Sequence, residues 1–137
     1  MIAIIDYGMG NLQSVQKAFE HLGYKACLSS GKDKILNADK VVFPGVGAFK
    51  DCMHNLKEAH LDEAIFESIE RKKPFLGICL GMQALLTESD EFGPTQGLNC
   101  IAGRVEKLAF EKLEQSAEAY KIPHVGWNQI KIQKDSP

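Results

Sequence analysis

Four short segments rich in apolar residues most constrain how this chain can fold. They span residues 2–5, 24–28, 41–43 and 75–78. Segments of this length are typical of strands, and residues 2–5 are apolar throughout, as in a strand buried on both faces. Apolar residues recur at helical spacing over residues 12–22 and 61–69. Because strands and helices alternate along the chain, we predict an α/β fold, an open and mostly parallel sheet with helices on both faces.

The later part of the chain is less regular. A helix is predicted over about residues 80–87, and residues 104–108 are compatible with a strand. Residues 112–120 are polar and weakly periodic, as in a helix or an exposed insertion. Residues 129–133 alternate strictly, which predicts an antiparallel edge or hairpin strand. Since the sequence ends at Pro137 without a partner for that strand, we expect the chain to be truncated at its C-terminus.

Length and charge restrict the classes of function. The 137 residues are 45% apolar and 25% charged, the proportions of an ordinary globular domain. Their number suits a single domain over residues 1–137 with one core. The chain has 16 Lys and Arg against 18 Asp and Glu, a net charge of −2. Because no basic run occurs either, nucleic-acid binding is not expected.

Nothing in the sequence indicates a secreted or membrane protein. The first six residues lack the positive charges of a signal peptide, and the longest nearly apolar stretch, residues 41–49, is too short to span a bilayer. The 4 cysteines form no C-x-x-C pair, so neither a zinc site nor a redox dithiol is indicated. We therefore expect a cytoplasmic protein with reduced thiols, without a metal or an organic cofactor.

The clearest local motif is Gly77-Ile78-Cys79-Leu80-Gly81, between a predicted strand and a predicted helix. It has the form of the G-x-S-x-G nucleophile elbow, with a thiol in place of the hydroxyl. Glycines are needed because the turn is tight and larger side chains two residues from the nucleophile would collide. The turn places the Cys79 sulfur at a helix N-terminus and the Leu80 amide near a developing oxyanion. A lone cysteine is more often a buried small side chain, but the two glycines favour a nucleophile.

A second loop, Pro44-Gly45-Val46-Gly47-Ala48-Phe49, follows the third predicted strand. Ligands bind outside the carboxyl ends of parallel strands, so we expect this loop and Cys79 at one edge of the sheet. The glycines beside Val46 allow the backbone amides to act as a second oxyanion donor, or serve only the turn itself. Residues 8–13 are close to a dinucleotide-binding fingerprint, but Gln13 stands where its third glycine is required. We interpret them as a loop at the same edge.

These segments resemble class I glutamine amidotransferases of the triad type. The matching residues are 44–49 and Pro74-Phe75-Leu76-Gly77-Ile78-Cys79-Leu80-Gly81-Met82-Gln83. Residues 6–12 (D-Y-G-M-G-N-L) and 123–128 (P-H-V-G-W-N) narrow the resemblance to the glutaminase subunits of imidazole glycerol phosphate synthase, of histidine biosynthesis. The similarity extends from Met1 to about Ile132. It implies the flavodoxin-like α/β fold of that family.

The resemblance implies glutaminase activity. Cys79 would attack the side-chain amide of L-glutamine, release ammonia and leave a γ-glutamyl thioester for water to hydrolyse. The amide of Leu80 and the backbone at Val46 and Gly47 would stabilise the oxyanion. Gln83 is similar to the residue that holds the substrate glutamine in the family.

The resemblance also implies a partner protein. Ammonia would pass to a cyclase subunit, a (β/α)₈ barrel, which forms a heterodimer with the glutaminase and makes imidazole glycerol phosphate and aminoimidazole carboxamide ribotide. Asn11, Trp127 and Asn128 match positions at the interface with that barrel. A lone Trp is more often a core residue, but Gly126 beside it favours an exposed turn. His124 belongs to the same run and is not assigned as the catalytic base.

The sequence departs from the family in one respect. The family's catalytic histidine lies in an H-P-x-E segment well downstream, and these 137 residues contain no such segment. A thiol without its base and orienting carboxylate loses most of its catalytic power, so we expect this chain to be inactive alone. Two alternatives stay open: a non-catalytic, partner-binding fragment of that subunit, and a glutaminase subunit of another biosynthetic amidotransferase.

Overall fold

The computed structural model describes residues 1–107 and 126–133. The chain divides into two compact units, Met1–Lys107 and Leu108–Pro137, and each is described by itself. The strands of the first unit are β1 (Ile2–Ile5), β2 (Ala26–Ser29), β3 (Lys40–Phe43), β4 (Phe75–Gly77), β5 (Leu86–Ser89), β6 (Thr95–Gln96) and β7 (Ile101–Val105). Its helices are α1 (Leu12–His21), α2 (Lys32–Leu36), α3 (Phe49–Glu58), α4 (Leu61–Glu70) and α5 (Leu80–Ala84).

Four parallel strands form the main sheet, in the order β2-β1-β3-β4. In β1, Ile2 stands opposite Ala26 of β2 on one side and Lys40 of β3 on the other. All residues of β1 are at most 6% exposed. A strand that is apolar throughout must be covered on both faces, which only a sheet between two helical layers provides. The predicted parallel α/β sheet is confirmed.

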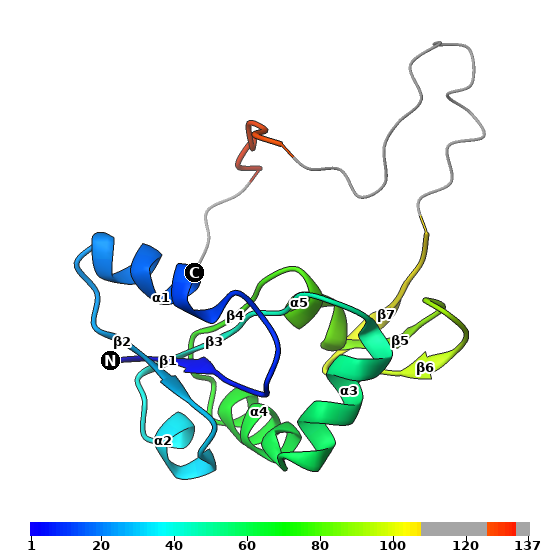
Figure 1. Ribbon diagram of the computed structural model, residues 1–137, viewed down its shortest axis with the longest axis horizontal. Helices are drawn as coiled ribbons and strands as arrows, with labels where there is room; N and C mark the ends of the chain where they lie inside the picture. Colours follow the sequence, from blue (N-terminus) through cyan, green and yellow to red (C-terminus); the bar gives the residue numbers. More distant parts are fainter. Residues whose placement is uncertain (108–125, 134–137) are drawn as a thin grey trace. The chain divides into compact units, whose positions relative to one another are not determined.

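The helices lie on both faces of this sheet (Figure 1). On one face, apolar side chains of α1 pack against Ile4 and Val42. On the other face, side chains of α2, α3, α4 and α5 form a larger core around Ile5 and Phe43, both fully buried. Burial of a side chain of this size contributes about 1.5–3 kcal/mol. The four strands therefore form a firm base for the loops at their carboxyl ends.

A second sheet of three strands has the order β6-β5-β7. Its strand β5 occupies residues that the predicted helix 80–87 included, so that prediction is wrong beyond Ala84. β5 pairs with β7 in parallel and with β6 in antiparallel orientation, and the Thr87 carbonyl accepts a hydrogen bond from Gly97 N–H (2.8 Å). Pairing with later strands overrides the local helical pattern. β7 covers residues 101–105, earlier than the predicted strand 104–108.

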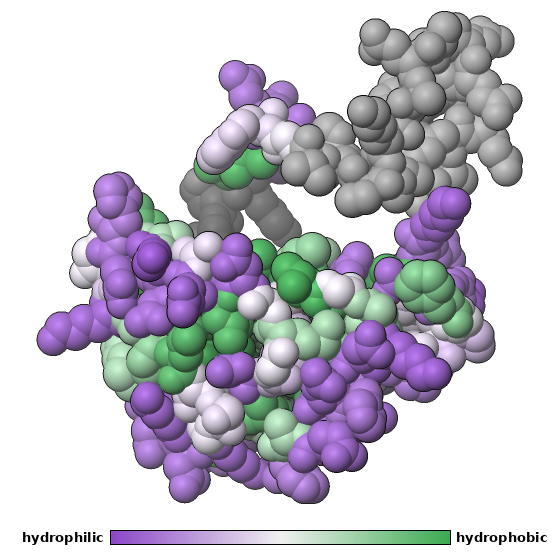
Figure 2. Space-filling model, in the orientation of Figure 1, coloured by the Kyte–Doolittle hydropathy of each residue, from purple (hydrophilic) through white to green (hydrophobic). Residues whose placement is uncertain are grey.

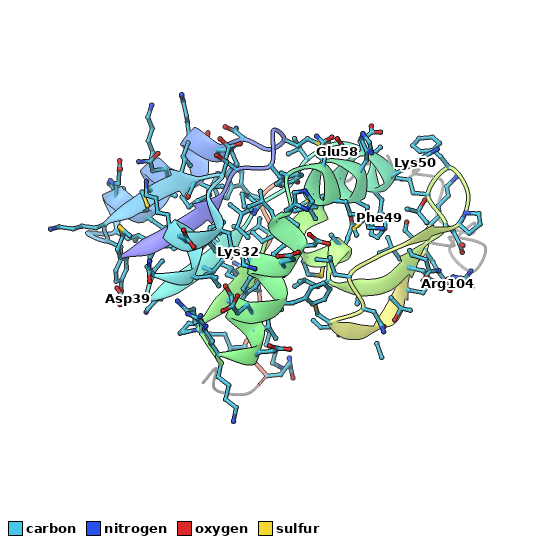
Figure 3. All side chains as sticks on the ribbon, turned by 90° about the horizontal axis from the view of Figure 1, so that it is seen from below. Lys32, Asp39, Phe49, Lys50, Glu58 and Arg104 are labelled. Atoms are coloured by element: carbon cyan, nitrogen blue, oxygen red, sulfur yellow. The ribbon has the colours of Figure 1, made fainter. Side chains whose placement is uncertain are left out.

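One helix, α2, was not predicted from the sequence. α2 has only 5 residues, too few to be stable in isolation. It lies against α4, where Lys32 Nζ forms ion pairs with the Glu63 carboxylate (2.8 Å) and the Glu67 carboxylate (3.7 Å). Figure 3 shows Lys32 between these two helices. Contacts with α4, rather than its own sequence, therefore hold α2 in place.

The second unit is described over residues 126–133, which form neither helix nor strand. The predicted strand 129–133 is therefore wrong. Ile130 and Ile132 are 88% and 77% exposed, as in a segment that pairs with no neighbouring strand among the described residues. A strand needs such a neighbour for its backbone hydrogen bonds. Residues 112–120 and His124 lie outside the described residues, and a single domain over residues 1–137 stays a prediction.

Candidate functional site

The candidate nucleophile lies on a sharp turn between β4 and α5. Cys79 has φ 52° and ψ −119°, a conformation that residues with a side chain rarely adopt and that costs on the order of 1–3 kcal/mol. Two hydrogen bonds fix the turn: Ile78 N–H donates to the Phe43 carbonyl and Gln83 N–H donates to the Cys79 carbonyl, each at 3.0 Å. The Cys79 side chain is exposed. The turn thus has the geometry of the elbow that the sequence predicts.

Close backbone contacts require the two glycines of this turn. A Cβ on Gly81 would lie 1.9 Å from the Phe43 carbonyl oxygen. A Cβ on Gly77 would lie 2.7 Å from Met82 Cα. Because both neighbours are backbone atoms, a larger residue at either position would force α5 away from the strands. The steric reason inferred from the motif is therefore present in the structure.

The loop over residues 44–49 contacts the turn, as the sequence predicts. A Cβ on Gly45 would lie 2.8 Å from both the Gly81 nitrogen and Leu80 Cβ. Gly47 has φ 99°, in the region that favours glycine. The side chain of Val46 between them is 51% exposed. The loop thus approaches the first turn of α5 with its backbone.

Polar groups of the loop and of α5 are available to a ligand. Within residues 1–107, the amides of Leu80 and Gly47 donate to no backbone or side-chain acceptor. Free N–H groups at the first turn of a helix favour an anion or a developing oxyanion. The half-buried Gln83 also makes no side-chain hydrogen bond within the same residues. These groups lie on the two segments that the contacts at Gly45 bring together.

Two side chains beside the loop were not found from the sequence. The Glu91 carboxylate accepts a hydrogen bond from Phe49 N–H (2.7 Å), at the end of the loop and the beginning of α3. Tyr7 is 4% exposed, and its hydroxyl oxygen would lie 2.7 Å from a Cβ on Gly45. Burial raises the pKa of the Tyr7 phenol. Glu91 comes 42 residues after Phe49 and carries no local signal, whereas Tyr7 stands in residues 6–12, which contribute to the family resemblance but indicate no role for this side chain.

The three predicted partner contacts are all exposed. Asn11 immediately precedes α1 and lines an open depression of about 340 Å³, together with Phe19 and Ile78 among others. Trp127 and Asn128 belong to the second unit, and the Trp127 side chain is fully exposed, as predicted.

On the first unit, hydrophobic side chains gather near the middle of the face that Figure 2 shows, within a hydrophilic surround. Exposed apolar groups of this kind are typical of protein contact surfaces.

The described residues show no histidine paired with Cys79. His21, His54 and His60 are exposed, and none of them is hydrogen-bonded to the Cys79 sulfur. Over residues 1–107 and 126–133, no group of three His, Cys, Asp or Glu side chains is arranged to hold a metal ion. In the same part of the chain, no helix has the length and hydropathy to cross a membrane.

A comparison with known protein families identifies the family in which this cysteine turn and glycine loop occur. The family model described as "Glutamine amidotransferase class-I" matches residues 3–135. The chain belongs to the class-I glutamine amidotransferase family. The resemblance found in the sequence is thereby confirmed, and the loop and the cysteine turn both fall inside the matched region.

Individual members of this family are similar over the whole chain. Proteins of Syntrophotalea carbinolica and Geobacter sulfurreducens, both named imidazole glycerol phosphate synthase subunit HisH, are 55% and 52% identical to it. The matches cover 100% and 99% of this chain, but 66% and 65% of those relatives. The chain thus spans slightly less than two thirds of the length of the curated relatives it matches.

Solved structures agree on the fold. A crystal structure of a glutamine amidotransferase matches with a TM-score of 0.58 and 18% identity, over 71% of this chain and 52% of that one. A putative peptidase E from Listeria monocytogenes matches with a TM-score of 0.54 and 18% identity, over 64% of this chain and 50% of that one. At this identity, the similarity shows a shared α/β fold alone.

Proposed function

We propose that this chain is part of a glutaminase subunit of imidazole glycerol phosphate synthase, acting in histidine biosynthesis in the cytoplasm. The observation that carries the proposal is the strained, exposed Cys79 turn packed against the glycine loop. The relatives named above support this synthase over another biosynthetic amidotransferase. The 4 free cysteines fit a reducing compartment.

In the proposed reaction, Cys79 Sγ bonds to the carbonyl carbon of the glutamine side-chain amide. The tetrahedral oxyanion accepts hydrogen bonds from the Leu80 amide and from the backbone of Val46 and Gly47. The C–N bond then breaks, and the nitrogen leaves as ammonia with the proton of the thiol. Water hydrolyses the thioester to glutamate and restores the thiol. Gln83 holds the substrate, and the proton transfers require a base besides the described histidines.

The ammonia is proposed to pass to a (β/α)₈-barrel cyclase that forms a heterodimer with the glutaminase subunit. That partner uses the ammonia in a lyase reaction that yields imidazole glycerol phosphate and aminoimidazole carboxamide ribotide. Asn11, Trp127 and Asn128 are proposed to contact it, which fits their exposure. The alternative, a non-catalytic fragment that binds the cyclase, keeps these contacts and lacks the chemistry at Cys79.

The full-length product of the gene that encodes this chain, prepared with the cyclase, allows the test. A diazoketone analogue of glutamine should modify Cys79, found by peptide mass spectrometry, and should block glutamate release. The variant Cys79→Ser should lose both, while Cys27→Ser, which changes a half-buried thiol on β2, should keep both. Absence of labelling and of glutamate release in the unmodified protein would support the non-catalytic alternative. Labelling that survives Cys79→Ser would exclude Cys79 as the nucleophile.

A further inference from the structure

Tyr7 carries a buried hydroxyl that packing does not explain. The residue follows β1, is 4% exposed, and its ring meets the Phe43 ring edge-on, with centroids 5.4 Å apart. Its hydroxyl is shielded from solvent, and no group of the described residues forms a hydrogen bond of normal geometry with it. An unpaired buried polar group costs about 1–3 kcal/mol, whereas phenylalanine would fill the same space without that cost. The hydroxyl therefore calls for a function.

Among the residues that the structure describes, no side chain is a good acceptor for the Tyr7 hydroxyl. The Cys52 thiol lies beside the hydroxyl and is at most a weak partner for it, because a thiol is a poor hydrogen-bond donor and acceptor. Burial is the main cause that raises the pKa of the phenol, and a negative charge on Cys79 would raise it further. The hydroxyl therefore keeps its proton at neutral pH and can act only as a neutral donor or acceptor.

The Tyr7 hydroxyl lies next to the loop over residues 44–49, at Gly45. The site of a Cβ on Gly45 is 2.7 Å from the Tyr7 oxygen, 2.8 Å from the Gly81 nitrogen and 2.8 Å from Leu80 Cβ. Tyr7 thus reaches the backbone of the loop where the loop contacts the cysteine turn. The main-chain carbonyls of the loop are strong acceptors, unlike the Cys52 thiol.

We propose that Tyr7 is a positioning residue, whose hydroxyl donates a hydrogen bond to a main-chain carbonyl of residues 44–47 when glutamine is bound. In a trans peptide the C=O and the N–H point in opposite directions. A donor behind the loop that holds a carbonyl therefore turns the amide of the same peptide outward, toward the substrate oxyanion. This inference rests on the proposed glutaminase function, and it assigns to Tyr7 the orientation of the oxyanion amides.

Steady-state kinetics of Tyr7→Phe test this role, in the full-length protein with the cyclase. Removal of one direct oxyanion donor costs about 10²–10³ in kcat. For a residue acting through the loop we expect kcat to fall about 10-fold, with KM for glutamine changed less than about twofold. The thermal midpoint should stay or rise, because at most a weak contact with the Cys52 thiol is lost from the resting state. Tyr24→Phe, at a tyrosine that is 55% exposed, should change none of these quantities.

The rate of Cys79 alkylation by iodoacetamide distinguishes an effect of Tyr7→Phe on the loop from an effect on the nucleophile. This reaction passes through no oxyanion, so its rate should be the same in wild type and Tyr7→Phe. An unchanged kcat would overturn the proposal, and so would a fall in kcat accompanied by a lower thermal midpoint or slower alkylation. If the unmodified protein neither hydrolyses glutamine nor reacts with the glutamine analogue, the proposed function itself fails. That result is distinct from activity that is normal in Tyr7→Phe.

Discussion

Replacement of Gly81 by alanine should strongly destabilise the first unit. The added Cβ would lie 1.9 Å from the Phe43 carbonyl oxygen and 2.7 Å from the carbonyl carbon. An ordinary contact between carbon and oxygen is about 3.3 Å, so the two groups must separate by roughly 1.4 Å. Phe43 lies on a central strand and is fully buried, and the atoms involved are backbone. No flexible side chain can relieve the overlap.

The loss of stability follows from the hydrogen bond that this separation breaks. The same Phe43 carbonyl accepts the hydrogen bond from Ile78 N–H, at 3.0 Å, which holds the cysteine turn to the sheet. Buried backbone groups left without a partner cost about 1–3 kcal/mol. Overpacking of a well-packed interior adds about 1–3 kcal/mol. We therefore expect Gly81→Ala to lower the free energy of unfolding by about 3–5 kcal/mol, a large share of the 5–15 kcal/mol typical of a domain.

Urea unfolding followed by circular dichroism measures the effect, with two other glycines for comparison. Gly77→Ala should cost less, because its closest contact would be 2.7 Å. Gly31→Ala is the control: its nearest atom is Ser29 Oγ at 3.9 Å, and we expect a loss below about 1 kcal/mol. A Gly81→Ala protein without a cooperative transition agrees with the large cost. A loss at Gly81 no larger than at Gly31 would refute the contact between α5 and β3.

Two further predictions concern the surface of the chain. Trp127→Ala should weaken binding of the cyclase about 30-fold, the effect of losing an aromatic hot spot of about 2 kcal/mol, whereas Tyr24→Ala should leave it unchanged in a titration calorimetry experiment. The ammonium group of Lys32 lowers the pKa of Glu63 from its usual 4.5, so this pair stabilises the fold above about pH 4.5 and the contribution is lost as the pH falls through the lowered pKa. Glu63→Gln should therefore lower the urea midpoint near pH 7 but hardly near pH 3, and a loss that is independent of pH would contradict this.

Local sequence patterns predict the main sheet because the apolar residues of its strands indicate that these strands are buried. Residues 2–5 are apolar at every position, and only a strand covered on both faces suits them. The glycines around Cys79 form an equally local pattern, although only the contact of Gly77 with Met82 is local, since Gly81 approaches Phe43 of β3. Both were predictable because each pattern is complete within a few residues of sequence.

Elements that depend on distant partners were not predictable in the same way. α5 ends at Ala84 because β5 pairs with β6 and β7, which come later in the chain. The alternation of residues 129–133 indicates a strand, but alternation supplies no partner, and the described residues contain none for it. Glu91 reaches the beginning of α3 across 42 positions of sequence. These outcomes depend on contacts between separate segments of the chain, which the local pattern of one segment does not show.

The candidate site is built from backbone more than from side chains, which explains why glycines mark it so clearly. At Gly45 the missing side chain lets the loop reach the Tyr7 hydroxyl and the first turn of α5, and at Gly81 it lets that turn reach β3. An oxyanion donor acts only within about 2.7–3.1 Å of its acceptor, so a displacement by the width of one methyl group would remove it from use. The side chains between the glycines do not hold the two segments together, since Val46 is exposed and Ile78 packs toward α1. The glycines of the motif therefore indicate where two segments of main chain must approach each other closely.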